Sequence, residues 1–271
     1  MKKQVSSQQT IALIQKNCLN KKRSKTLSQR QWRVLLKDKK SLFIKRFGNR
    51  KHCVKLAKNY TSKTVIDGIF KALSRFGVKG NNRILEPAMG TGNFFGFMPK
   101  EIADGAKLYG VELDKITGKI AKELYPQAKI QIKGFEETSF ADNSFDLMVT
   151  NVPFGGYTVF DPDYNKYNFY IHDYFIAKGI DKIKPNGLMA VITSKGTMDK
   201  QNPSIRKYIA DRAELVGAIR LPNTAFKQTA NTEVVTDVLF FRKREEKINA
   251  NIENTEWLTI CNNFPTPELW R

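Results

Sequence analysis

The stretch Arg83-Ile84-Leu85-Glu86-Pro87-Ala88-Met89-Gly90-Thr91-Gly92 decides the fold, because it leads from a short apolar strand into a glycine-rich turn. Small residues in such a turn let the backbone approach a bound ligand closely. A second apolar strand, Leu108–Asp114, follows about 20 residues later and carries the acidic residue Glu112 near its end. This order predicts an α/β fold whose ligand sites lie at the carboxyl ends of its strands.

Strands and helices continue to alternate through the body of the chain. Apolar residues at helical spacing predict four helices: Ser62–Phe76, Ile116–Leu124, Phe169–Ile183 and Ser204–Arg212. Short apolar runs predict five further strands: Lys129–Ile132, Phe145–Thr150, Leu188–Thr193, Leu215–Arg220 and Val234–Arg242. We therefore expect a doubly wound, seven-stranded, mostly parallel sheet, in which the last strand could be antiparallel because no crossover helix precedes it.

A second motif, Asn151-Val152-Pro153-Phe154, directly follows the predicted strand Phe145–Thr150. The Asn151 side-chain oxygen and the Val152 carbonyl can each accept one N–H of a planar amino group. Pro153 restricts the backbone that presents this carbonyl, and Phe154 offers a flat base a stacking surface. These four residues are the predicted catalytic residues, and the predicted chemistry is methyl transfer to an amino group of a nucleobase.

The residues after this motif are expected to bind the base. The run Gly155-Gly156-Tyr157 leaves space for a base and permits loop motion. Phe226 is a candidate second wall for the base, although a plain core position explains this residue equally well. The predicted substrate-binding residues are Phe154, Gly155, Tyr157 and Phe226.

The glycine turn also has alternative explanations. A tight turn between a strand and a helix requires glycine, and Glu112 could be an exposed acid at a strand end. A dinucleotide site would share this acid, which can accept both hydroxyls of a ribose, but it needs a G-x-G-x-x-G pattern. Here Gly92 is followed by Asn93-Phe94-Phe95-Gly96, and Pro87 precedes the turn, so S-adenosylmethionine fits better.

Two further segments are candidate cofactor contacts. Phe135 could cover one face of an adenine and Glu136 could accept from its amino group, while a core phenylalanine beside solvated acids is an equally good explanation. Tyr60 and Thr61 could contact the cofactor carboxylate or serve only to cap the following helix. The predicted cofactor-binding residues are Tyr60, Thr61, Glu86, Pro87, Ala88, Gly90, Gly92, Phe94, Glu112, Leu113, Phe135, Glu136 and Asn151.

Positive charge is concentrated at the start of the chain. The whole sequence has 46 Lys and Arg residues against 26 Asp and Glu residues, for a net charge of +20. Residues 1–58 contain 18 basic residues and a single acid, Asp38, so +17 of that charge lies there. Short helical stretches, Ser7–Lys16 and Ser28–Leu36, predict a basic helical extension that contacts nucleic-acid phosphates. The alternative is a solvated tail.

The predicted domains are therefore this extension (1–58), a main domain (59–244) and a C-terminal tail (245–271). Three scattered cysteines without a C-x-x-C pair, and only two histidines, predict neither a metal site nor disulfides. His172 is expected to be structural. No apolar run is long enough to span a membrane and no signal-peptide core is present, so a cytoplasmic protein is expected.

Taken in order, these motifs resemble the amino-methylating class of S-adenosylmethionine-dependent nucleic-acid methyltransferases. The closer resemblance is to the N6-adenine DNA methyltransferase domain of large methylase–helicase proteins of bacterial mobile elements and phages, and it covers roughly Tyr60 to Arg244. The motifs that carry it are Tyr60-Thr61, Ile84–Phe94, Gly110–Asp114, Gly134-Phe135-Glu136, Asn151–Gly155, Ser194–Asp199 and the run from Leu221 through Phe226 to Asp237. Ser62 stands where that family usually has proline.

The resemblance implies a Rossmann-like fold and transfer of a methyl group from S-adenosyl-L-methionine to N6 of adenine in DNA, with the base flipped out of the helix. Those relatives continue into helicase and recognition regions, which makes a separate recognition or helicase subunit a candidate partner. RNA adenine, cytosine N4 and a non-catalytic nucleic-acid-binding subunit are the alternatives.

Overall fold

The structure is a computed structural model that describes residues 61–222, 235–251 and 253–258. The predicted basic extension, Tyr60, Phe226 and most of the predicted tail lie outside these residues. The described residues all belong to one compact unit, Arg50–Arg271.

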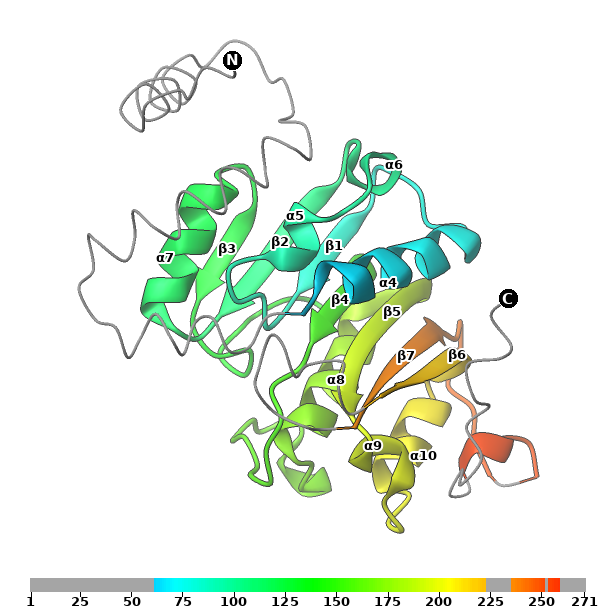
Figure 1. Cartoon of the computed structure of the whole chain (residues 1–271). Helices are drawn as coiled ribbons and strands as arrows, with labels where there is room; N and C mark the ends of the chain where they lie inside the picture. Colours follow the sequence, from blue (N-terminus) through cyan, green and yellow to red (C-terminus); the bar gives the residue numbers. More distant parts are fainter. Residues whose placement is uncertain (1–60, 223–234, 252, 259–271) are drawn as a thin grey trace, which may run out of the picture. The chain divides into compact units, whose positions relative to one another are not determined.

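A seven-stranded sheet forms the centre of this unit, with the strand order β3-β2-β1-β4-β5-β7-β6 (Figure 1). Strands β1 to β5 are parallel, and β7 is antiparallel to both β5 and β6. The strands are β1 Arg83–Glu86, β2 Lys107–Glu112, β3 Lys129–Ile132, β4 Phe145–Asn151, β5 Ile183–Ser194, β6 Ala213–Leu221 and β7 Thr236–Lys243. The prediction of a seven-stranded, mostly parallel α/β sheet with an antiparallel last strand is confirmed.

The order in which strands are added to the sheet reverses between β1 and β4, which are parallel neighbours. The chain moves outward from β1 to β3 and then returns to place β4 on the other side of β1. In doubly wound folds, ligands bind in the crevice outside the carboxyl ends of the strands at such a switch point. The strand order alone therefore predicts a ligand site at the carboxyl ends of β1 and β4.

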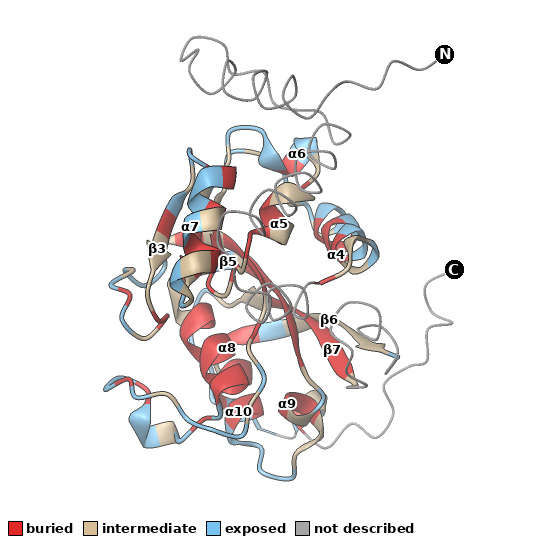
Figure 2. Ribbon diagram, turned by 60° about the vertical axis from the view of Figure 1, so that its left-hand side comes forward, coloured by how far each residue is buried: buried red, intermediate tan, exposed pale blue. Residues whose placement is uncertain are grey.

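Helices cover both faces of the sheet, with α4 on one face and α8 and α10 on the other (Figures 1 and 2). Helix α4 begins after Ser62, whose hydroxyl accepts a hydrogen bond from the Val65 amide as an N-cap. The helices are α4 Lys63–Arg75, α5 Asn93–Gly96, α6 Lys100–Ala103, α7 Lys115–Leu124, α8 Ile171–Lys182, α9 Gly196–Asp199 and α10 Ser204–Ala210, with 3-10 turns η1 Asn165–Tyr167 and η3 Glu256–Leu258.

Helix α8 is buried around its whole circumference, as Figure 2 shows by its colour. Its apolar residues pack with the central strands in the largest core cluster. The same helix also buries three ionisable side chains, His172, Asp173 and Lys178. Burying an ionisable group is unfavourable unless the group is paired, so we expect a polar partner for each of these side chains.

The start of β5 differs from the prediction. The sequence predicted a helix to Ile183 and a strand from Leu188, because Pro185-Asn186-Gly187 between them is typical of a turn, but β5 begins at Ile183 and includes these residues. Phe145 pairs with Ile183 and Leu147 with Leu188, so the extra residues of β5 form an irregularity in the ladder. Asn186 has a left-handed backbone there (φ 63), which suits asparagine. Residues 185–187 therefore interrupt the regular pairing of β5 without ending the strand.

Candidate active site

Four strand ends meet at the carboxyl edge of the parallel sheet. Glu86 ends β1, Glu112 ends β2, Gly134 follows β3 and Asn151 ends β4. These strands are neighbours, so residues separated by up to 65 positions in sequence come to one place. This edge is where the topology predicts a ligand.

The glycine turn lies between β1 and α5. Gly90 and Gly92 have φ values of 56 and 79, a backbone region that favours glycine. A β-carbon on Gly92 would lie 2.4 Å from the ring of Tyr125, whereas one on Gly90 would meet no atom within 4 Å. The Tyr125 hydroxyl also donates to the Gly92 carbonyl at 2.6 Å. Gly92 is therefore required by packing, and Gly90 faces open space that a ligand can enter.

Glu112 fixes this turn against the end of β2. One carboxylate oxygen accepts from the Gly90 amide and the other from the Asp114 amide, each at 2.8 Å. Burial raises the pKa of Glu112, and these two N–H groups oppose that rise. Each oxygen keeps a further lone pair that could accept from a ribose hydroxyl. Glu112 is thus not a free acid at a strand end, and its contact with Gly90 was not predicted.

Glu86 is buried at the end of β1. Its side chain is 2% exposed, and one carboxylate oxygen has no hydrogen-bond partner among the described residues. Burial, followed by the charge of Glu112, raises the pKa of Glu86 well above its usual value. A cationic ligand nearby would restore the ionised form, because opposite charges favour it. The site therefore fits a positively charged cofactor.

Asn151 presents a second unpaired acceptor at the end of β4. Its side-chain nitrogen donates to the Thr61 hydroxyl at 3.1 Å. Its side-chain oxygen is buried and has no partner among the described residues. The Val152 amide donates to the Ile192 carbonyl at 3.1 Å, which ties the motif to β5. Thr61 thus orients the Asn151 amide so that its oxygen is available to a donor such as an amino group.

Two predicted base-binding residues lie next to this motif. Phe154 is 39% exposed and offers a ring face to a ligand. The ring of Tyr157 covers Gly155, since a β-carbon on Gly155 would lie 2.4 Å from it. The expected space above Gly155 is therefore filled by Tyr157 in this structure, which corrects that part of the prediction.

Two predicted cofactor residues are buried among other aromatic rings. Phe135 is 1% exposed, and its ring lies 5.2 Å from that of Phe175. Phe94 is 2% exposed and makes an edge contact with Phe70. Of the two explanations open for Phe135, the core position is the observed one. The contact between Phe94 and Phe70 packs α5 against α4.

The remaining predicted cofactor residues differ in how exposed their side chains are. Leu113, directly after Glu112, is 72% exposed, which suits an apolar contact with a flat ring. Pro87 is buried and Ala88 is half-buried at the start of the glycine turn. Glu136 is half-buried, and its backbone carbonyl accepts from Lys178 at 3.3 Å.

Lys178 belongs to a buried polar cluster that sequence reasoning missed. Its ammonium group lies 2.8 Å from an Asp161 carboxylate oxygen, and both side chains are 5% exposed. The Tyr174 hydroxyl donates to the same carboxylate at 2.6 Å. This cluster joins the segment after the Asn151 motif to α8. The available signal was a lysine on an otherwise apolar helix.

A second polar cluster occupies the first turn of α8. Asp173 accepts from the Thr197 hydroxyl at 3.0 Å and pairs with Lys200. Burial lowers the pKa of His172, as does the charge of Lys200, whereas Asp173 and the Gly155 backbone oppose this. The lowered pKa favours the neutral form of this buried imidazole, which contacts the backbone of Gly155 after the Asn151 motif.

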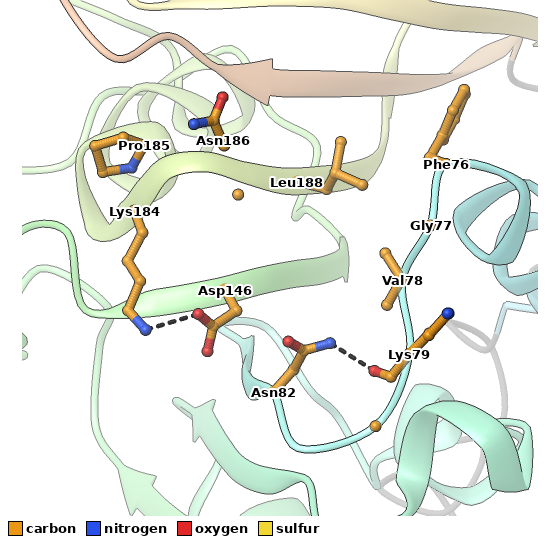
Figure 3. Close-up of a pocket in the computed structure, with 12 residues that line it drawn as sticks. Phe76, Gly77, Val78, Lys79, Asn82, Asp146, Lys184, Pro185, Asn186 and Leu188 are labelled. Carbon is orange, nitrogen blue, oxygen red and sulfur yellow. Dashed lines mark hydrogen bonds and ion pairs between the residues drawn. The ribbon is translucent and has the colours of Figure 1, made fainter.

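The larger of the two described cavities lies elsewhere. It has a volume of about 350 Å³ and is lined by residues such as Asn82, Asp146 and Lys184, at the amino ends of β1, β4 and β5 (Figure 3). Lys184 pairs with Asp146 at 2.6 Å, and the Asn82 amide donates to the Lys79 carbonyl. This cavity is at the opposite edge of the sheet from Glu86 and Asn151.

Solved structures define the class of this fold. A proposed class I S-adenosylmethionine-dependent methyltransferase from Listeria monocytogenes superimposes with a TM-score of 0.63 at 19% identity, over 85% of this chain and 73% of that one. The chain therefore has the Rossmann-like methyltransferase fold.

A family model described as N-6 DNA Methylase matches residues 36–259, and the chain belongs to this family. Defense against restriction protein B of Escherichia phage P1 is 33% identical over 201 residues, which are 71% of this chain and 8% of that protein. The type I restriction enzyme EcoEI methylase subunit of Escherichia coli is 26% identical over 64% of this chain and 41% of that protein. The chain thus spans less than half the length of either relative.

Family membership implies S-adenosyl-L-methionine as the cofactor, and the resemblance inferred from sequence is confirmed. None of the helices in the described ranges has the length and apolar character needed to cross a bilayer. The same ranges contain no group of three or more side chains suited to hold a metal ion.

Proposed function

We propose that this chain transfers a methyl group from S-adenosyl-L-methionine to the N6 amine of adenine in DNA. The observation that carries the proposal is the buried Asn151 side-chain oxygen, which has no partner among the described residues although Thr61 fixes the rest of the amide. An unpaired buried acceptor is unfavourable, so it points to a donor supplied by a ligand. An amino group supplies that donor.

The residues of the motif would hold the amine from one side. The Asn151 oxygen and the Val152 carbonyl accept its two N–H groups, which concentrates electron density on the nitrogen. Phe154, which is partly exposed, stacks on the base. Phe226 is proposed as the second wall and lies outside the described residues.

The opposite side of the site would hold the cofactor. When bound, S-adenosylmethionine supplies an electrophilic methyl group on a positively charged sulfur. Glu86 would hold the cationic part of the cofactor, Glu112 would accept from the ribose hydroxyls, and Leu113 would contact the adenine face. Asn151, at the end of the neighbouring strand β4, would contribute to both the cofactor site and the base site.

Positioning supplies most of the rate enhancement. The nitrogen becomes acidic only as the new bond forms, so solvent can take the proton afterwards and no residue must remove it first. Holding two reactants in line replaces an encounter between free molecules with a step inside one complex, which lowers the entropic part of the barrier. The adenine has to leave the base stack to reach this position.

The rest of the chain would serve nucleic-acid binding. Residues 1–58, with a net charge of +17, are proposed as an extension that contacts phosphates, next to a main domain at 59–244 and a tail at 245–271. Deleting residues 1–58 should weaken DNA affinity and flatten its salt dependence. The similarity to a type I methylase subunit supports a separate recognition or helicase subunit as a partner. A cytoplasmic location in a bacterium or phage-infected cell fits these proposals.

Product analysis tests the proposed reaction. The protein is incubated with methyl-labelled S-adenosylmethionine and either DNA or RNA, and the nucleosides are then identified by mass spectrometry. The proposal predicts label in N6-methyladenine from DNA. Label found only in N4-methylcytosine, or only in RNA, would assign the chemistry to a different amine.

A further inference from the structure

Exposed aromatic side chains gather on the segment that joins β4 to α8. Among the described residues, the exposed large hydrophobic side chains are Leu113, Phe154, Tyr157, Phe160, Tyr170 and Ile248. Four of these six lie between positions 154 and 170, and Phe160 is 78% exposed. Clustered apolar exposure on one surface segment usually marks a binding surface.

Backbone pairing places Tyr170 next to the residues that follow the Asn151 motif. Thr158 forms an antiparallel bridge with Tyr170, and the Ile171 amide donates to the Tyr157 carbonyl at 2.9 Å. Tyr157 in turn covers Gly155 of the motif. The segment, the light-green loop beside α8 in Figure 1, therefore leaves the motif and returns next to it.

Polar contacts on the buried side of this segment hold it against α8. Asp161 accepts from Tyr174 and pairs with Lys178, both on α8. Tyr164 donates from its hydroxyl to Asp181 at 2.8 Å. Because these polar contacts fix the backbone, the exposed rings are displayed in advance and lose little freedom on binding.

Lysine side chains lie over two tyrosine rings of this segment. The Lys200 ammonium group lies 5.3 Å from the centre of the Tyr170 ring, and Lys166 lies 5.1 Å from that of Tyr167. Lys195, at the end of β5, is exposed. The Lys200 ammonium group also pairs with the buried Asp173 carboxylate, so the rings themselves carry the argument: exposed flat rings suit a ligand with flat, unpaired bases that can stack on them.

We propose that Tyr157, Phe160 and Tyr170 form a stacking surface for the unpaired nucleobases that flank the target amine. The occupant is a single-stranded segment of nucleic acid. This inference rests on the proposed function, since it places the surface next to the amine held by Asn151.

Affinity measurements on ring variants test this surface. Tyr157→Ala, Phe160→Ala and Tyr170→Ala are prepared singly and together, with Ile248→Ala as a matched control for an exposed apolar residue elsewhere. Binding of a fluorescent single-stranded DNA is followed by anisotropy, and thermal unfolding checks that each variant folds. Each ring should contribute about a 5-fold to 100-fold difference in affinity, while Ile248→Ala should bind like the wild type.

Two further readouts separate stacking from other contacts. Loss of a ring should leave the slope of log affinity against log salt concentration unchanged, because no phosphate contact is removed. Leucine in place of Phe160 or Tyr170 should bind as weakly as alanine. Leucine variants that bind like the wild type, or an equal loss of affinity for fully paired DNA, would overturn the proposal. A parallel measurement with single-stranded RNA shows which strand the surface prefers.

These measurements need no methyl transfer, so the two proposals can fail separately. Ring variants that lose affinity while no N6-methyladenine forms would support the surface and reject the proposed function. Methylated DNA with unchanged affinities would support the function and reject the surface. A wild-type protein that does not bind single-stranded DNA would likewise reject the surface.

Discussion

The two edges of the central sheet differ in how completely their carboxylate and amide oxygens are paired, although a buried donor at the amino edge, Arg83 Nε, also has no partner among the described residues. At the amino edge, a cavity of about 350 Å³ contains Asp146, which pairs with Lys184 and accepts from the Arg83 amide. At the carboxyl edge, Glu86 and Asn151 each keep a buried oxygen without a partner among the described residues. The difference teaches that buried acceptors without partners, rather than a cavity, mark the edge that binds a ligand.

The largest expected effect follows from removing the unpaired amide. Asn151→Ala should lower the rate of methyl transfer by at least about 100-fold, the loss typical when one positioned hydrogen-bonding group is deleted from an active site. Cofactor affinity should change much less. Transfer is measured with labelled S-adenosylmethionine and DNA, and affinity by calorimetry.

Asn82→Ala is the matched control, because it removes an asparagine side chain at the amino edge that donates only to the Lys79 carbonyl among the described contacts. It should transfer methyl groups at the wild-type rate. Equal rates for Asn151→Ala and the wild type would remove the distinction between the two edges.

The next largest effect concerns the buried pair that holds the aromatic segment. Asp161→Asn leaves the charge of Lys178 buried without its partner, which should destabilise the fold by about 3–5 kcal/mol. Chemical denaturation measures this free energy. The double variant Asp161→Asn with Lys178→Met should recover much of the loss. If the single variant is as stable as the wild type, the pair does not hold the segment.

A smaller effect is expected at Glu86. Glu86→Gln keeps the shape of the side chain but removes the charge that the cationic cofactor restores, so affinity for S-adenosylmethionine should fall about 10-fold. Asp146→Asn, at the amino edge, should leave this affinity unchanged. Calorimetry on both variants measures the difference, and equal losses would show that Glu86 has no special contact.

The smallest effect is a difference in pH dependence between the edges. Burial and Glu112 raise the pKa of Glu86, so the folded protein holds a proton that the unfolded chain releases above about pH 4.3. Without cofactor, unfolding free energy should therefore decrease as pH rises from that value through the raised pKa, and Glu86→Gln should remove this slope.

Asp146 should show the opposite slope. Burial tends to raise its pKa, but Lys184 and the Arg83 amide bring it below the usual value. Its contribution is complete above the ordinary pKa and is lost as pH falls through the lowered one. The unfolding free energies of Glu86→Gln, Asp146→Asn and the wild type are measured by denaturation at pH values below and above the ordinary carboxyl pKa. If both carboxyl groups changed the unfolding free energy with pH in the same direction, the opposite pKa shifts of Glu86 and Asp146 would be contradicted.

Much of the fold was predictable because strand signals were local. The bounds of β1 and β3 agree with the predicted strands, and α4 and α7 begin at residues whose side chains cap them. The four-residue helices α5, α6 and α9 were not predicted, because periodicity is not readable over so short a run. The start of β5 was missed because a turn signal inside a strand resembles a boundary.

The candidate site was predictable only where sequence position fixes spatial position. Strand ends such as Glu112 and Asn151 were placed correctly at one edge, because parallel strands align them. Phe94 and Phe135 were assigned to the cofactor, but whether a ring faces the core or a ligand depends on packing that spacing does not encode. The pair of Asp161 with Lys178 depends on how a long loop folds over α8.

The most direct test of the comparison follows backbone amide signals by NMR during a titration with S-adenosylmethionine. The amides of Gly90 and Asp114, which donate to Glu112, should shift strongly, while those of Asn82 and Gly187 at the amino edge should stay in place. Shifts confined to the amino edge, or no shifts at a saturating concentration, would contradict a cofactor site at the carboxyl edge.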